Sequence, residues 1–147
     1  MGALSIYTGR IAEMKIGNGN DIVAVDDDDL FIIRETFHRS DYENNFISFH
    51  QQEAFLQYME TVKQGVSQMP ALVLLDVNMP LIDGFELLEK IKSIPYFAEL
   101  PIFIMLSNSD RPQDRENAVR LGAEGLIEKM EIVRGTFSFE LEKLLCS

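Results

Sequence analysis

The sequence predicts an α/β fold, a doubly wound parallel sheet of five strands with helices on both faces. Its apolar pattern alternates between short strand-like runs and helical stripes, which gives five strand–helix units in about 125 residues. The third run, residues 71–75, is continuously apolar, as a strand covered on both faces should be. Repeats of this kind form parallel strands joined by right-handed helical crossovers. Periodicity does not give the strand order.

The predicted elements follow one another at short intervals. The first strand, Ile22–Val25, is a short run rich in β-branched residues, and the later strands cover Phe46–Phe49, 71–75, 101–106 and 125–127. Each strand is followed by a helix, and the apolar stripes of these helices lie at Leu30, Ile33 and Phe37; at Phe55, Tyr58, Met59 and Val62; at Phe85, Leu88 and Ile91; at Ala118 and Leu121; and at Phe137, Leu141, Leu144 and Leu145. We expect residues 131–135 to form a loop.

Composition indicates one globular domain without a membrane segment. The chain has 147 residues, of which 46% are hydrophobic and 25% charged. We expect a flexible arm at residues 1–20 and the folded domain at 21–147, since the arm ends in a Gly- and Asn-rich stretch. No secretory signal is visible, and the single cysteine, Cys146, suits a reducing cytoplasm. The net charge of −11 argues against direct nucleic-acid binding.

Polar side chains follow four of the five predicted strands. Four aspartates, residues 26–29, come after the first strand, Asp76 after the third, Ser107 after the fourth and Lys129 after the fifth. The carboxyl ends of parallel strands form one edge of the sheet, where ligands of such folds bind. Taken singly, each residue has an ordinary structural role, and Asp29 is expected to cap the following helix. Their joint placement favours a functional site.

These side chains predict a metal-assisted phosphoryl acceptor. Clustered carboxylates repel one another unless a cation neutralises them, and an incomplete set of oxygen ligands favours Mg²⁺. A carboxylate beside a metal, a lysine and a hydroxyl is suited to receive a phosphoryl group, because the cations neutralise its oxygens in the transition state.

On these residues the sequence resembles the receiver domain of two-component response regulators. The resemblance covers about residues 21–145 and is carried by Val25-Asp26-Asp27, by the run from Leu74 through Asp76 and Pro80 to Asp83-Gly84, by Ser107, and by Leu121-Gly122-Ala123 up to Lys129. It implies a flavodoxin-like sheet of order 2-1-3-4-5. It also implies that Asp76 accepts the phosphoryl group and that Ser107 and Lys129 contact it. Mg²⁺ would be held by the carboxylates of Asp27 and Asp76, by the backbone carbonyl of Asn78 and, through water, by Asp26. A register one residue later, at Asp27 and Asp28, is the alternative.

Three positions depart from the family pattern. Met130 follows the lysine where proline is usual, so we expect a trans Lys129–Met130 bond. Leu126 replaces an aromatic residue whose rotation reports phosphorylation, so we expect a modest response on that face. Asn108 stands where a very small residue is usual, and we expect it to narrow access to the site.

The resemblance implies a signalling protein rather than an enzyme. We expect a cytoplasmic, single-domain regulator that takes its phosphoryl group from a histidine kinase or phosphotransfer protein, assists its own phosphorylation and dephosphorylation, and signals by docking to another protein, with a homodimer as one option. One alternative is a pseudo-receiver that serves as a phosphorylation-independent interaction module. Another is an aspartyl-nucleophile phosphatase, which Asn78 disfavours because that class has a second carboxylate two residues after the nucleophile.

Overall fold

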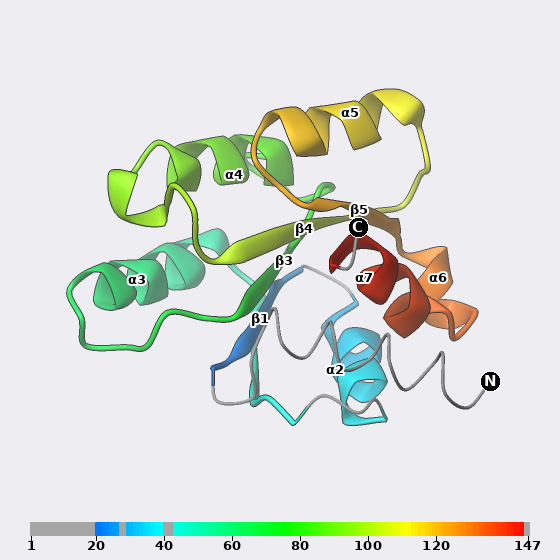
Figure 1. The fold of residues 1–147 in the computed structure, drawn as a ribbon, viewed down its shortest axis with the longest axis horizontal. Helices are drawn as coiled ribbons and strands as arrows, with labels where there is room; N and C mark the ends of the chain where they lie inside the picture. The colour runs from blue at the N-terminus through cyan, green and yellow to red at the C-terminus, as the bar shows by residue number, and fades with distance from the viewer. Residues whose placement is uncertain (1–19, 27–28, 40–42, 146–147) are drawn as a thin grey trace.

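Five parallel strands form one sheet at the centre of the molecule (Figure 1). The computed structural model describes residues 20–26, 29–39 and 43–145. The strands are β1 (Ile22–Val25), β2 (Phe46–Phe49), β3 (Leu72–Asp76), β4 (Ile102–Ser107) and β5 (Gly125–Glu128), and they lie in the order β2-β1-β3-β4-β5. The predicted fold class and strand order are therefore confirmed.

Helices cover both faces of the sheet (Figure 1). One face packs against α2 (Leu30–His38), α6 (Met130–Val133) and α7 (Phe137–Leu145), and the other against α3 (Gln52–Lys63), α4 (Gly84–Lys92) and α5 (Pro112–Arg120). A 3₁₀ turn, η1 (Pro95–Phe97), lies between α4 and β4. Within the described ranges every helix is too short or too polar to span a bilayer.

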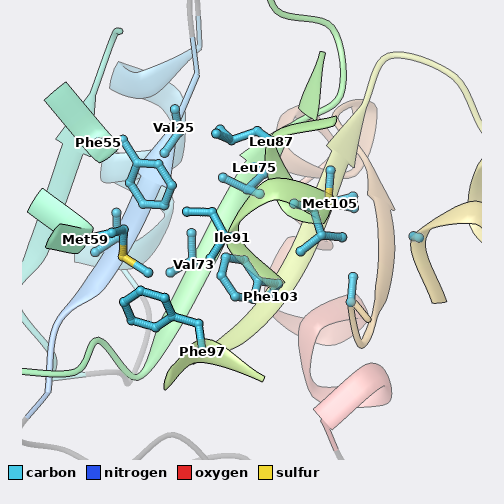
Figure 2. Close-up of a cluster of buried hydrophobic side chains, with 14 of the residues drawn as sticks. Val25, Phe55, Met59, Val73, Leu75, Leu87, Ile91, Phe97, Phe103 and Met105 are labelled. Atoms are coloured by element: carbon cyan, nitrogen blue, oxygen red, sulfur yellow. The ribbon is translucent and has the colours of Figure 1, made fainter. Parts of the chain in front are cut away.

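The core consists of two apolar layers, one on each face of the sheet. Figure 2 shows the layer beneath α3 and α4, in which Phe55, Met59, Leu87 and Ile91 point toward side chains of β3 and β4. Every residue of β3 is buried, which confirms the prediction of a strand covered on both faces. Burial of these aliphatic and aromatic side chains, at about 25 cal/mol per Å² of apolar surface, is the main force that holds the helices to the sheet.

The predicted boundaries differ from the observed ones near the site. β3 and β4 each end one residue later than predicted, so Asp76 and Ser107 are the last residues of their strands. The expected loop at 131–135 was wrong, because Lys129 has helical backbone angles (φ −60°, ψ −26°) and α6 begins directly after it. Proline at 130 would disfavour that conformation of Lys129, whereas methionine permits it. The Lys129–Met130 bond is trans, as predicted; the cis bond in the described ranges is Leu100–Pro101.

Candidate functional site

Strand register brings four of the predicted site residues to one edge of the sheet. Asp26 directly follows β1, whose last residue pairs with Leu75 of β3. Asp76 pairs with Leu106 of β4, and Ser107 pairs with Glu128, the residue before Lys129. Three of the four are nearly inaccessible to solvent, and Lys129 is buried as well.

Lys129 is the centre of the site. Its ammonium nitrogen lies 2.9 Å from Asp26 Oδ2, 3.0 Å from Asp29 Oδ2 and 3.1 Å from Asp76 Oδ2. The Lys129 main-chain N–H donates to the Ser107 carbonyl at 2.7 Å, which fixes where the side chain starts. A lysine ammonium has three donors, so each proton has one carboxylate to meet.

Asp76 is held by the loop that follows it. Its Oδ1 accepts the main-chain N–H of Asn78 at 3.0 Å, while Oδ2 faces Lys129. Gly84, the first residue of α4, packs directly on the Asp76 carbonyl, and a Cβ at position 84 would overlap that oxygen. Asp83 caps α4 by accepting the Glu86 N–H at 2.9 Å. The Asp-Gly pair therefore fixes the helix against the strand end that carries Asp76.

The site shifts the pKa values of Asp76 and Lys129 for different reasons. Burial raises the pKa of the Asp76 carboxyl to about 6; the neighbouring Asp26 adds to the rise, while the Asn78 N–H and Lys129 oppose it. Burial of the Lys129 ammonium disfavours its charge, but ion pairs with Asp26, Asp29 and Asp76 outweigh this and raise its pKa above the ordinary value. The asymmetry arises because one ammonium serves three carboxylates. The ion pairs of Lys129 outweigh the cost of burying its charge, whereas the ion pair of Asp76 does not.

Asn78 lies in the loop after β3, and Ser107 is the last residue of the neighbouring strand β4. The Ser107 hydroxyl oxygen accepts the Ser109 N–H at 3.2 Å, and Ser107 is buried at the end of β4. The Asn78 side-chain oxygen faces the Asn108 N–H at 3.4 Å, which links the loops after β3 and β4. Both residues lie at the edge of the sheet that the sequence predicted for them.

Asp29 departs from its predicted role. It stands at the N-cap position of α2, but its side chain makes no cap hydrogen bond. Its carboxylate binds Lys129 instead, and its N–H donates to Asp26 Oδ1 at 3.1 Å. The sequence signal for this pairing was an acid three residues after Asp26, which is equally typical of a helix cap.

Asn108 and Leu126 are the remaining positions that depart from the family pattern. A pocket of about 220 Å³ is lined by Asp29, Ile32, Asn108, Lys129, Met130, Ile132 and Val133. Asn108 is exposed at its wall. Leu126 is buried in β5, and its carbonyl accepts a hydrogen bond from the Arg115 guanidinium at 3.0 Å. The expectations of narrowed access at Asn108 and of a modest response at Leu126 stay predictions.

The donor set of the site fits a divalent cation. Asp26 and Asp76 are buried carboxylates that share a single ammonium with Asp29, so further positive charge would be stabilised beside them. The predicted ligand Asp27 and its alternative Asp28 lie outside the described residues, as does Cys146. Among the described residues no group of three or more His, Cys, Asp or Glu side chains is arranged to hold a metal. The fit therefore rests on the chemistry of Asp26, Asp76 and the Asn78 carbonyl.

The sequence matches a profile of the response regulator receiver domain over residues 22–134. The chain is 29% identical over 111 residues to the response regulator protein GraR of Staphylococcus saprophyticus subsp. saprophyticus, which covers 74% of this chain and 44% of GraR. It is 39% identical over 61 residues to the gliding motility regulatory protein of Myxococcus xanthus, covering 42% of this chain and 8% of that protein. The chain spans at most about half the length of the first curated relatives it matches.

Solved receiver structures share the fold. The phosphorylated cyanobacterial phytochrome response regulator RcpA superposes with a TM-score of 0.72 at 24% identity, covering 88% of this chain and 95% of RcpA. The Mn²⁺-bound form of response regulator Rcp1 superposes with a TM-score of 0.68 at 26% identity, covering 84% of this chain and 95% of Rcp1.

Proposed function

The chain belongs to the response regulator receiver domain family, and from this premise we propose that it accepts a phosphoryl group on Asp76 from a histidine kinase or phosphotransfer protein. The observation that carries the proposal is the Asp26–Lys129–Asp76 arrangement beside the buried Ser107. Asp76 is the acceptor because its carboxylate lies at the carboxyl end of β3, between the Lys129 ammonium and the Asn78 N–H. A pKa of about 6 leaves it mostly ionised, and so nucleophilic, at neutral pH.

The residues of the site divide the work of the transfer. An Asp76 oxygen attacks the phosphorus of the donor as the bond from phosphorus to the donor's leaving group breaks. Lys129 stays close enough to pair with the negative oxygens that arrive, and the Ser107 hydroxyl donates to them. Asp26, Asp27, Asp76 and the Asn78 carbonyl would hold Mg²⁺, which supplies positive charge to the phosphoryl oxygens when bound.

The setting of this reaction is also a proposal. The proposed domain covers residues 21–147. By the family pattern, it is cytoplasmic and signals by docking to a further protein. A homodimer remains one form that such docking could take.

The test is labelling with a small phosphodonor. Incubation with acetyl phosphate and Mg²⁺ should add the mass of one phosphoryl group, and omission of Mg²⁺ should abolish the gain. Asp76→Asn keeps the shape of the acceptor without its nucleophile, so its mass should not change. The control is Glu116→Gln, which removes an exposed carboxylate of α5 outside the site and should label normally. Labelling of Asp76→Asn would refute the assignment, and absence of labelling in the unaltered chain would favour the interaction module.

A further inference from the structure

Asp29 directs its carboxylate into the site rather than onto its own helix. Its backbone (φ −110°, ψ 16°) lies outside the extended conformation usual at an N-cap, and no side-chain cap bond forms. The Asp29 N–H is bound to Asp26 Oδ1 at 3.1 Å, so the main chain is fixed to the residue that begins the acidic run. Asp29 Oδ2 lies 3.0 Å from the Lys129 ammonium. Asp29 therefore forms an ion pair with Lys129 and does not cap α2.

The three carboxylates around Lys129 differ in exposure. The side chains of Asp26 and Asp76 are 0% and 2% exposed, that of Lys129 10%, and that of Asp29 37%. The ammonium consequently lies between two inner carboxylates and one outer carboxylate at the wall of the 220 Å³ pocket. The outer partner is open to solvent and the inner two are not.

A divalent cation would compete with the ammonium for the inner carboxylates. Both carry positive charge and both are attracted to Asp26 and Asp76, so they repel each other when they share those ligands. A buried ammonium that lost both inner partners would be strongly destabilised unless another carboxylate remained beside it. Asp29 is placed to be that carboxylate.

We propose that Asp29 is a positioning residue for Lys129. When a divalent cation binds beside Asp26 and Asp76 and displaces the Lys129 ammonium from them, Asp29 holds the ammonium at the rim of the site. The inference rests on the proposed function for the identity of the carboxylates that bind the cation. Two other roles for Asp29 would leave different signatures: a direct ligand of the cation, or a charge that acts through the general field of the site.

A double-mutant cycle on Mg²⁺ affinity separates these roles. Titration calorimetry on the full chain should show that Asp29→Asn weakens Mg²⁺ binding about three- to tenfold. This is the size of coupling typical of two residues in contact with each other, here Asp29 and Lys129. Lys129→Met should tighten binding because the competing ammonium is gone. In the Lys129→Met background, Asp29→Asn should change the affinity by less than about twofold. Asp29→Glu should restore most of the loss, and Glu116→Gln, which removes an exposed carboxylate of α5, should have little effect.

A second measurement follows the lysine itself. With Mg²⁺ at saturation, the ¹³Cε NMR signal of Lys129 should stay distinct from those of exposed lysines in the unaltered chain and should merge with them in Asp29→Asn. Equal losses of Mg²⁺ affinity with and without Lys129, no loss at all, or no Mg²⁺ binding by the unaltered chain would each overturn the inference. Phosphoryl labelling is read separately: its absence with the coupling intact refutes only the proposed function, and its presence without coupling refutes only the role of Asp29.

Discussion

Among the residues of the site, Asp76 has an ionisation that makes the stability of the protein depend on pH. Its side chain is almost fully buried, and burial raises its pKa to about 6 from an ordinary 3.8. In the unfolded chain the group ionises near pH 4, whereas in the folded chain it stays neutral until about pH 6. The unfolded state therefore loses its proton first, and stability falls as pH rises through this window. The ionised form of Asp76 therefore lowers stability at neutral pH, and a bound cation would offset this cost.

Asp76→Asn should stabilise the metal-free protein in a pH-dependent manner. The amide resembles the neutral carboxyl, so the gain in unfolding free energy should be at most about 3 kcal/mol at pH 7.5 and about 0.5 kcal/mol at pH 4. Urea unfolding at both pH values in the presence of a chelator measures the difference. Glu116→Gln, which removes an exposed carboxylate of α5, is the control and should be neutral at both. A gain of the same size at pH 4 and pH 7.5 would contradict the explanation.

At the scale of elements, the contact between α4 and the end of β3 positions Asp76, the proposed phosphoryl acceptor. Gly84 is the first residue of α4, and its N–H donates to the Val77 carbonyl at 3.0 Å. Glycine is needed there because a Cβ would overlap the carbonyl oxygen of Asp76, which is main chain and cannot move aside. The first residue of α4 and the last residue of β3, Asp76, are therefore in direct contact.

Gly84→Ala should destabilise the protein by about 3 kcal/mol, although the same change in a helix elsewhere usually stabilises. Gly125→Ala is the matched comparison: its Cβ would meet Leu144 Cδ2 at 2.6 Å, but that contact is the end of a partly buried side chain that can rotate, so the cost should be below about 1.5 kcal/mol. Thermal unfolding of both variants gives the comparison. Equal costs would show that the Asp76 carbonyl yields as readily as a leucine side chain.

The sequence predicted elements well where the apolar pattern was strong. β1 and β2 were predicted at their observed bounds, and the buried faces of the helices followed from stripes such as Phe55, Met59 and Val62. α6 was missed because Met130–Val133 is only four residues long and its single buried side chain, Ile132, gives no periodicity. This helix is held by local main-chain hydrogen bonds, in which the Ile132 N–H donates to the Lys129 carbonyl at 3.0 Å and the Arg134 N–H to the Met130 carbonyl at 2.9 Å.

The clustering of four predicted residues at the strand ends was anticipated from the sequence, but the pairings of their charges were not. Asp26, Asp76, Ser107 and Lys129 each end or follow a strand, and parallel topology alone brings strand ends together. The pairing of Asp29 with Lys129 joins residues 100 positions apart, and no local pattern distinguishes it from a helix cap. Local chemistry therefore predicted where the charges gather, and only the folded geometry decides which charges meet.

At the scale of the whole molecule, excess negative charge and the proposed cation site should both make stability depend on salt. A net charge of −11 produces self-repulsion, which any salt screens. A cation that binds Asp26 and Asp76 adds a separate stabilisation that depends on its concentration relative to its dissociation constant. The two effects differ in which ions produce them and in whether they need Asp76.

Mg²⁺ should therefore raise the melting temperature more than NaCl of equal ionic strength. At ten times its dissociation constant, a ligand that binds only the folded state contributes about 1.4 kcal/mol, which corresponds to roughly 3–6 °C for a domain of this size. Asp76→Asn should lose this increment, because it removes one of the two buried carboxylates, and should keep the rise produced by NaCl. Glu116→Gln should keep both. If Mg²⁺ and NaCl were equivalent in the unaltered chain, or if Asp76→Asn kept the whole Mg²⁺ increment, the cation would act by screening alone and the strand-end carboxylates would not be its site.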